Sequence, residues 1–480
     1  MGSSNTYAIL IAFTAGMGGF LFGYEIGVIG QVLAIQDFIS TFGTSDAAIN
    51  SWVASLFQFG CVFGAAAFSV LADTLGRKRS ILVSGSIFAV GGVLQAVASS
   101  LPVLLVGRVV SGLAIGIASM VVPVYIAETA AAASRGTLTV IYQLMITIGI
   151  LVAAIVNTVV IEVSGGVAAG AAWPWRVCMG IQAIPAVILV LLVSFIPYSP
   201  RWLAEKGRHE EGLAVIAKLR GLNGTDSAAI EEYKAIRDNA EYEASIGNAG
   251  WGELFKGSNR RRVIIGMVNQ AFQQLTGINV ILYFGPTLYK NLGFSDVMST
   301  EIMPIVFDFI NCVCTFPGMY GIEKFGRKPL LQWGALGMAL AHASVFFTGQ
   351  ASTSQGSSTL GGLALFFVAM FYFFFASTWG PVVWSYQSEI FPLRIRSKGT
   401  AVCTMTNWGV GAIITWAFPQ VQAALTTTAD VYWIFFSFCI AMGVWVFFAV
   451  PETKGLTLEE IGRVFGDKTA DDVSAKSITV

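Results

Sequence analysis

The motif "ADTLGRKRS", residues 72–80, returns later in the chain as "IEKFGRKPL", residues 322–330. Each copy holds an acid, a glycine and an arginine in the same order. The matched pairs are Asp73 and Glu323, Gly76 and Gly326, and Arg77 and Arg327. The chain is therefore predicted to contain two copies of one structural unit.

Two further motifs recur in the same order. "PVYIAETAAAASRGT" (123–137) matches "SEIFPLRIRSKGT" (388–400), and each holds a glutamate and an arginine at the same spacing: Glu128 and Arg135, and Glu389 and Arg396. "PYSPRW" (197–202) and "PETKG" (451–455) each follow a long apolar stretch. The repeat therefore extends over most of the chain.

The composition indicates a membrane protein. Of the 480 residues, 55% are hydrophobic and only 12% are charged, against about 25% charged in soluble domains. A membrane-spanning helix needs about 20 apolar residues. The predicted spans lie in residues 6–24, 47–72, 80–107, 102–127, 136–161, 177–200, 263–289, 300–322, 329–388 (two spans), 399–429 and 431–451. The sequence thus predicts an all-α membrane protein with twelve transmembrane helices.

Several classes of function are disfavoured. The net charge is zero, so there is no basic surface for nucleic acid. The six cysteines fall inside apolar spans, and His209 and His342 lie far apart without partners. No metal site and no cofactor are expected, and no nucleophile–base pair indicates an enzyme.

The positive charges predict the orientation. All but three of the 28 Lys and Arg residues lie in alternate loops and at the ends of the chain; the exceptions are Arg108, Arg176 and Lys290. The positive-inside rule places both termini and the central polar stretch in the cytoplasm. Two runs of that stretch, 210–221 and 227–244, have helical apolar spacing and predict short cytoplasmic helices.

The repeat divides the chain into four segments. We expect an N-terminal six-helix bundle over 1–200, an intracellular helical linker over 201–262, a C-terminal six-helix bundle over 263–451 and a short cytoplasmic tail over 452–480. Six spans per half give both halves the same orientation. Parallel six-span repeats are the architecture of alternating-access carriers, which bind substrate between the halves.

The repeated charges are predicted to form an inner gate of ion pairs that holds the cytoplasmic side closed in one state. Solvated loop charges would contribute little to stability, which is the alternative interpretation. The gate residues are Asp73, Arg77, Glu128, Arg135, Arg201, Glu323, Arg327, Glu389 and Arg396.

The ordered set of motifs resembles the sugar porter family of the major facilitator superfamily, and most of all its fungal monosaccharide transporters. The motifs are "DTLGRKR", "GRVVSGLAIG", "PVYIAETA", "PYSPRW", "QQLTGINVILY", "EKFGRK", "WGPVVW", "SEIFPLRIR" and "PETKG". Tyr198 departs from the family, which usually has glutamate there. That difference is expected to weaken one contact of the inner gate.

Amide and aromatic side chains inside the spans predict a sugar site. Amides both donate and accept hydrogen bonds, and aromatic rings cover the apolar face of a sugar. Asn407 belongs to this set by its place in a span. The resemblance implies sugar contact for Gln143, Gln273, Gln274, Asn279 and Asn311, with Phe22 and Trp384 as walls and Trp408 below the ring. The alternative is that the amides join helices to one another.

Glu25 lies in an apolar run, "FLFGYEIGVIG" (20–30), and its expected partner is Arg108, the arginine inside a span. The resemblance implies a role in proton coupling, because proton-coupled relatives carry an acid here. A static Glu25–Arg108 pair is the alternative. The role of Asp308 stays open: it is either a functional acid or an acid whose side chain reaches a polar interior. Two dipeptides, Gly285–Pro286 and Gly380–Pro381, are expected to interrupt their helices.

The function implied is transport of a monosaccharide, a hexose or pentose, in symport with a proton, by a monomer in the lipid bilayer of the cell membrane. A facilitative uniporter is the first alternative. A transporter-like glucose sensor is the second, although sensors carry a long cytoplasmic tail and about thirty residues follow the last span here.

Overall fold

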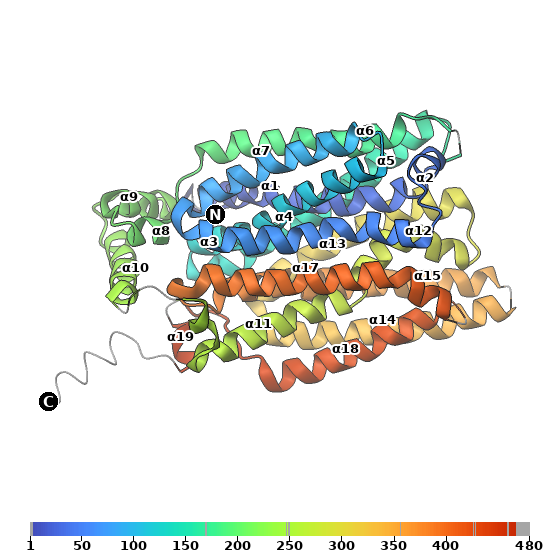
Figure 1. The fold of residues 1–480 in the computed structure, drawn as a ribbon. Coiled ribbons are helices and arrows are strands. Elements are labelled where there is room, and N and C mark those ends of the chain that lie inside the picture. The colour runs from blue at the N-terminus through green and yellow to red at the C-terminus, as the bar shows by residue number, and fades with distance from the viewer. Residues whose placement is uncertain are drawn as a thin grey trace.

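The computed structural model describes residues 3–466 except 169, 246, 248, 249, 356, 426, 428, 458 and 459; the side chains of 3–5, 68, 70–73, 358 and 393 lie outside this description. Regular structure in the described part is helical, and long helices run side by side in one bundle (Figure 1). Asp73 and residues 467–480 of the predicted tail fall outside the described side chains.

The first half consists of the helices that precede the central polar stretch. They are α1 (Ser3–Val32), α2 (Gln36–Phe42), α3 (Ala47–Ala96), α4 (Leu101–Thr129), η1 (Ala132–Ser134), α5 (Arg135–Val163), α6 (Pro174–Ile181) and α7 (Ala183–Phe195). Helix α3 makes two crossings, because Gly76 has a non-helical conformation between them.

The second half has the same order of crossings. Its helices are α11 (Gly257–Leu275), α12 (Ile278–Asn291), η3 (Met298–Ile302), α13 (Met303–Lys324), α14 (Arg327–Gln355), α15 (Ser358–Phe374), η4 (Phe375–Trp379), α16 (Gly380–Glu389), α17 (Leu393–Ala424) and α18 (Asp430–Ala449). The short α19 (Ile461–Val464) follows.

Eleven helical segments of the described chain are long and apolar enough to cross a membrane. The twelfth crossing is made by α11 and α12 together, which agrees with the predicted number. These two helices are separated at Thr276–Gly277, where Gly277 has φ +86°, a value that favours glycine. Neither helix alone is both long and apolar enough to count as a crossing.

The expected interruption at Gly285–Pro286 was wrong, because α12 continues through both residues. Proline lacks an N–H, so the carbonyl four residues earlier, that of Leu282, loses its helical donor. That carbonyl faces Gly30 of α1, where an added Cβ would lie 2.7 Å from it. Close packing against a glycine thus accommodates the proline without a break.

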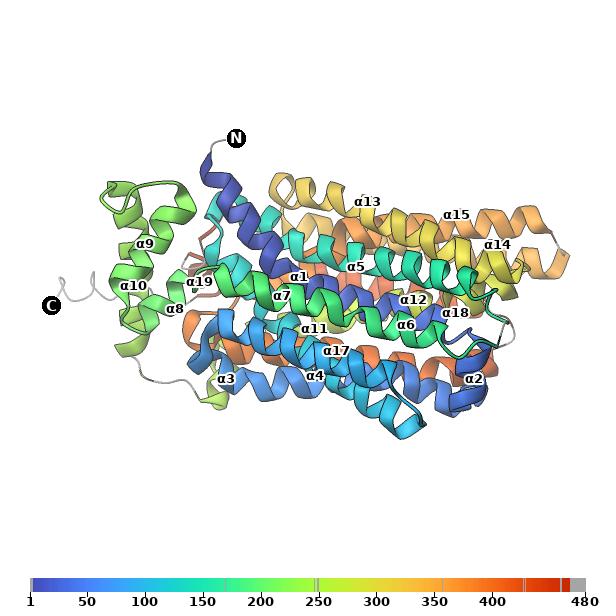
Figure 2. The ribbon, with the colours of Figure 1, turned by 90° about the horizontal axis from the view of Figure 1, so that it is seen from above.

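The two halves meet mainly where α3 packs on α17, α5 on α13 and α1 on α12; α16 also contacts α4 and α5, and α17 also contacts α4. Figure 2 shows the blue and green helices of the first half beside the yellow and red helices of the second. The start of α1 and the short α19 lie at the same end of the bundle as the helices of the linker (Figure 1). A site between the halves is therefore bounded by helices of both.

The linker contains α8 (Pro200–Glu205), α9 (His209–Arg220), α10 (Ser227–Ser245) and η2 (Trp251–Phe255), in agreement with the predicted short helices. Arg220 holds α9 to α10 by two bonds to Glu232, at 2.7 and 2.9 Å, and donates to Thr129 O of α4 at 3.1 Å. Glu253 accepts from Lys256 at 2.8 Å, and this contact lowers the pKa of the Glu253 carboxyl.

Four glycines let α3 and α4 approach closely. Gly60 and Gly64 lie on α3, and Gly112 and Gly116 face them from α4. A Cβ added at Gly64 would lie 2.1 Å from Leu113 O, and one at Gly116 would lie 2.1 Å from Cys61 O. Small residues are the usual means by which membrane helices pack backbone to backbone.

Gly64→Ala should therefore lower the thermal stability of the purified protein. The new methyl group must push two backbones apart, and overpacking of this kind costs about 1–3 kcal/mol. The matched control is Gly362→Ala, since an added Cβ at Gly362 meets nothing within 4 Å. Equal unfolding temperatures for the two variants would show that the α3–α4 contact is not tight.

Candidate functional site

The Glu25 carboxyl is buried on α1 and contacts an arginine of α4. Arg108 Nη1 lies 2.7 Å from Glu25 Oε1, and both side chains are fully buried. Gln95 Nε2 of α3 donates to both carboxylate oxygens, at 3.2 and 3.4 Å. An ionised acid at this depth costs several kcal/mol, and charge-assisted hydrogen bonds compensate for that cost.

Arg108 is held in place by the backbone of α3. Its Nε donates to Val53 O at 3.0 Å and its Nη2 donates to Ala54 O at 3.3 Å. The Phe57 ring lies 5.4 Å from the guanidinium carbon, within the range of a cation–π contact. The arginine is therefore fixed to α3 and α4, and a movement of α1 would change its separation from Glu25.

Four of the predicted amides join in one hydrogen-bonded cluster. Asn279 Nδ2 donates to Gln274 Oε1 at 2.5 Å, and Gln274 Nε2 donates to Asn407 Oδ1 at 2.9 Å. Asn407 Nδ2 then donates to Gln273 Oε1 at 2.7 Å. The break at Thr276–Gly277 brings Asn279 of α12 back toward Gln274 of α11.

The sequence analysis missed one member of the cluster, Gln270, and two amides near it, Gln387 and Gln58. Gln270 Oε1 accepts from Asn407 Nδ2 at 2.6 Å, and Gln270 Nε2 donates to Gln387 Oε1 at 2.8 Å. Gln58 of the first half donates to the Tyr283 hydroxyl at 3.3 Å. Gln270 was detectable, because it lies one helical turn before Gln274 in the same uncharged stretch. We call Gln270, Gln273, Gln274, Asn279 and Asn407 the amide cluster.

The second expected interruption, at Gly380–Pro381, is a π-helical turn. It covers Phe375–Trp379, directly before Gly380. Gln273 Nε2 donates to the carbonyls of Trp379 and Gly380, at 3.0 and 3.1 Å. Irregular backbone inside a membrane protein is stable where other groups satisfy its polar atoms, and Gln273 does so here.

The three predicted aromatic residues lie together beside the amide cluster. The Phe22 ring is 4.8 Å from that of Trp408 and 6.3 Å from that of Trp384. Trp408 Nε1 donates to Ser119 Oγ at 3.0 Å, so Trp408 joins α17 to α4. Tyr142, which was not predicted, lies 6.1 Å from Trp384. Aromatic surfaces from both halves thus face one another.

The remaining two predicted amides, Gln143 and Asn311, are not part of the hydrogen-bonded cluster. Gln143 is buried on α5, and a Cβ added at Gly380 would lie 3.1 Å from its Nε2. Asn311 is buried on α13, and its Oδ1 has no hydrogen-bond partner among the residues described. Asn311 therefore keeps a polar atom available for another group.

The charged residues of the first repeat meet at the linker end of the bundle. Arg77 Nη2 lies 3.0 Å from Glu128 Oε1. Ser199 Oγ donates to Glu128 Oε2 at 2.5 Å, and Tyr125 donates to Pro197 O at 2.7 Å. The "PYSPRW" segment is thus bound to the end of α4.

The second repeat makes the same contacts with its own residues. Arg327 Nη2 lies 2.7 Å from Glu389 Oε1. Thr453 Oγ1 donates to Glu389 Oε2 at 3.0 Å, and Tyr386 donates to Pro451 O at 3.1 Å. The two sets match residue by residue, so the sequence repeat corresponds to a repeated structure.

Glycine is required at positions 76 and 326 for the same structural reason. Gly76 and Gly326 have φ of +78° and +94°, a conformation that L side chains rarely adopt. A Cβ would lie 2.7 Å from Trp202 at the first position and 2.6 Å from Glu452 at the second. Each glycine therefore lets the segment that follows the last crossing of its half pack closely.

Tyr198 occupies the place in the first repeat that Glu452 occupies in the second. Glu452 accepts from the backbone N–H groups of Arg327 and Lys328, at 3.0 and 2.9 Å. The Tyr198 ring instead lies 5.2 Å from Lys78 Nζ and stacks on Trp202 at 5.1 Å. A cation–π contact thus stands where the second half has a carboxylate.

Contacts between the halves come from other members of the predicted gate. Arg396 Nη1 lies 3.1 Å from Glu128 Oε1. Glu323 Oε1 accepts from the Thr137 N–H at 3.0 Å. Both contacts join the first half to the second at the linker end, so they close this end of the structure.

The other predicted gate residues surround these contacts. Arg135 Nη1 donates to Leu456 O at 3.0 Å, which also joins the two halves. Arg201 is buried and acts electrostatically on Glu128. The side chain of Asp73 lies outside the described residues. The gating role itself stays a prediction.

Arg396→Gln should shift the protein toward the state that is open at the linker end. It removes a charge-assisted bond between the halves, which we expect to exist in the closed state alone. Such a bond contributes about 1.5–3 kcal/mol, equivalent to about 10- to 150-fold in the equilibrium. The readout is labelling of a Ser385→Cys probe, because Ser385 is fully buried behind the contacts.

Two controls accompany this measurement. Arg208→Gln removes an exposed arginine that pairs with Glu211 inside the linker, and should leave labelling unchanged. Glu389→Gln should shift it less than Arg396→Gln, since the Glu389 contacts lie within one half. Unchanged labelling in Arg396→Gln would remove this pair from the gate.

The arrangement defines a class of protein. Two repeated halves of six crossings, polar and aromatic side chains between them and a charge network at one end are typical of an alternating-access membrane carrier. The family model described as sugar (and other) transporter matches residues 11–465. The chain belongs to this family.

Relatives and solved structures agree with this assignment. The chain is 36% identical to the arabinose-proton symporter of Escherichia coli K12, covering 95% of this chain and 93% of the relative. It is 35% identical to the high-affinity hexose transporter HXT6 of Saccharomyces cerevisiae, covering 95% and 80%. These relatives are transporters, and this multi-pass membrane protein is one too.

The structure is similar to that of XylE, a proton:xylose symporter. With XylE bound to 6-bromo-6-deoxy-D-glucose the TM-score is 0.85 at 29% identity, covering 97% of this chain and 100% of the other. With XylE from E. coli in an inward-open conformation the TM-score is 0.72 at 27% identity, covering 95% and 100%. The chain thus differs more from the inward-open arrangement, in keeping with its closed linker end.

Proposed function

We propose that this protein carries a monosaccharide, a hexose or pentose, across the membrane together with a proton. The observation that carries the proposal is the amide cluster of the second half, next to the aromatic surfaces that Phe22 of the first half and Trp384 and Trp408 of the second form together. Amides can match the donors and acceptors of sugar hydroxyls, and flat rings can cover the sugar's apolar face.

The substrate would bind by exchange of hydrogen bonds. Gln274 and Asn279 now bond each other, and a sugar hydroxyl can replace one such bond without leaving a buried group unpaired. Gln143 and the Asn311 Oδ1 atom, which has no partner among the described residues, add contacts from α5 and α13. Contact with both halves would draw the halves together around the sugar.

The proton would be carried by Glu25. Arg108 is held by α3 carbonyls, so movement of α1 changes the distance between the two charged groups. When the carboxyl moves away from the arginine, it loses its counter-charge, and an unpaired buried charge is expensive. Uptake of a proton removes that cost, and this links sugar binding to protonation.

The orientation and organisation belong to the same proposal. The linker end, with the charge network, would face the cytoplasm together with both termini, and the protein would lie in the cell membrane. Residues 1–200 and 263–451 would move as two bodies joined by the linker over 201–262. One copy holds all the proposed site residues, so we propose that it acts as a monomer.

The test is uptake of labelled hexoses and pentoses by cells that lack their own hexose carriers. We expect uptake against a gradient that an uncoupler abolishes. Uptake that runs only downhill, and that neither uncoupler nor external pH alters, would assign a uniporter. Absence of uptake by purified protein in vesicles, with sugar binding retained, would favour the sensor.

A further inference from the structure

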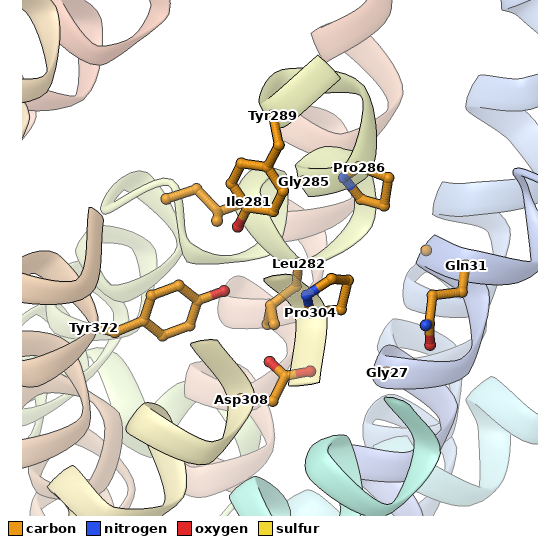
Figure 3. A pocket seen from close by; sticks show the side chains of 11 residues that line it. Gly27, Gln31, Ile281, Leu282, Gly285, Pro286, Tyr289, Pro304, Asp308 and Tyr372 are labelled. Carbon is orange, nitrogen blue, oxygen red and sulfur yellow. The ribbon is translucent and has the colours of Figure 1, made fainter. Parts of the chain in front are cut away.

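A pocket lies between the halves on the side of the sugar-site residues away from the charge network. It is small and partly open, with room for a substituent of a ligand rather than for a whole sugar ring. It is lined by α1, α12, α13 and α15, and its polar members are Gln31, Tyr289, Asp308 and Tyr372. Figure 3 shows Asp308 and Tyr372 across the pocket from Gln31.

Asp308 differs from every other buried acid described above, because no basic side chain compensates it. Glu25, Glu128 and Glu389 each contact an arginine. Asp308 is 5% exposed and makes no ion pair or hydrogen bond with the residues that the structure describes. An ionised carboxylate inside a membrane protein is expensive without a partner, so a ligand that brings positive charge would stabilise the ionised form of Asp308.

On the other side of the pocket, the side-chain oxygen of Gln31 also lacks a hydrogen-bond donor. Gln31 is 2% exposed, and its Nε2 is occupied by Thr158 Oγ1 and Thr300 O, both at 2.9 Å. Its Oε1 has no partner among the described residues. The pocket therefore combines an acid of the second half with an enclosed amide oxygen of the first half that has no donor among the described residues. A ligand rich in donors and carrying a cation satisfies both.

The pocket adjoins the proposed sugar site. Asp308 lies one helical turn from Asn311 on α13, and the lining residue Leu282 follows Asn279 by three positions on α12. Phe307 holds both tyrosines in place: the Tyr372 ring stacks on it at 5.6 Å, and the Tyr289 ring packs tilted against it at 5.3 Å. A sugar that occupies both places keeps its ring among the amides and directs one substituent toward Asp308.

We infer that this pocket is a binding site for protonated amino sugars, with Asp308 as the group that pairs with the ammonium. The inference rests on the proposed function, because it assumes that a sugar reaches the amide cluster. Asp308 therefore determines specificity between charged and neutral sugars. Gln31 and the tyrosine hydroxyls accept the remaining donors of the ligand.

The experiment compares two inhibitors of labelled-hexose uptake. Glucosamine carries its charge at about pH 6, since amines of this kind titrate near pH 8, and 2-deoxyglucose is its neutral counterpart. In Asp308→Asn we expect inhibition by glucosamine to weaken about 10-fold or more. Inhibition by 2-deoxyglucose should change by less than about 2-fold.

The matched control is Asp296→Asn, which removes an exposed carboxylate that contacts Lys290 near the same end of the second half. This substitution should leave inhibition by glucosamine and by 2-deoxyglucose unchanged. Equal changes for both inhibitors in Asp308→Asn, or none, would overturn the inference. So would a change confined to the pH dependence of neutral-sugar uptake, which would assign Asp308 to proton binding.

A measurement on the unaltered protein keeps the inference testable if Asp308→Asn does not fold. Between about pH 6 and pH 9 glucosamine loses its charge, so its inhibition should weaken relative to that of 2-deoxyglucose. A constant ratio would overturn the amino-sugar site. Hexose uptake measured in the same samples tests the proposed function separately, because it is independent of the ratio.

Discussion

Glu25→Gln should abolish accumulation of sugar against its gradient and leave exchange of sugar across the membrane intact. One proton moving down about 100 mV releases roughly 2.3 kcal/mol, and a pH difference of one unit adds about 1.4 kcal/mol. Together they sustain an accumulation of about 500-fold. The neutral amide keeps the shape of the side chain and its place beside Arg108 and Gln95, but it cannot take up and release a proton.

The two measurements are steady-state accumulation and counterflow, made on the same vesicles. Glu241→Gln, at an exposed position of α10, is the control and should keep both. Loss of counterflow together with accumulation would mean that the variant is misfolded or cannot bind sugar. Full accumulation in Glu25→Gln would make the Glu25–Arg108 contact a static link between α1 and α4.

Gln274→Ala should raise the half-saturation concentration of the transported sugar by about 5- to 150-fold. The truncation removes the acceptor of Asn279 and the donor to Asn407. Each unpaired buried group costs about 1–3 kcal/mol. Gln143→Ala should act in the same direction from the opposite half, and uptake kinetics at equal surface expression give the comparison.

Gln350→Ala is the matched control, because Gln350 bonds Thr427 and Asp430 away from the amide cluster. It should leave the half-saturation concentration within about 2-fold. A lower unfolding temperature in Gln274→Ala, with unchanged half-saturation, would favour the alternative that the amides join helices. Unchanged kinetics in both Gln274→Ala and Gln143→Ala would remove these residues from the site.

The sequence predicted the architecture because its determinants are local or repeated. Uncharged stretches give the crossings, and the two copies of the Gly-Arg-Lys motif give the two halves. Even the contacts of Glu128 and Glu389 with their arginines follow from the repeat. The interruption of the seventh crossing was placed wrongly, because proline is a stronger local signal than Gly277, whose conformation depends on how α11 and α12 pack.

The sequence predicted the residue types of the site, which are local features, but not their hydrogen-bond partners. The types of residue in the amide cluster are visible in the sequence, whereas their partners are set by the approach of α11, α16 and α17. Gln387 lies in a stretch with no other amide before Asn407, so nothing in the sequence joined it to Gln270. The isolation of Asp308 is likewise a property of the packed structure, since it depends on which charged groups lie nearby.

The contacts of Glu128 have a consequence for the speed of transport. Arg77 and Ser199 belong to the same half as Glu128, and among the partners found in the described part of the chain Arg396 comes from the other half. When the halves separate, the carboxylate loses one of three partners and is never left alone in an apolar environment. In the proposed gate, the activation barrier for opening therefore excludes the large desolvation cost of an orphaned ion, and we expect turnover to be fast although buried charges join the halves.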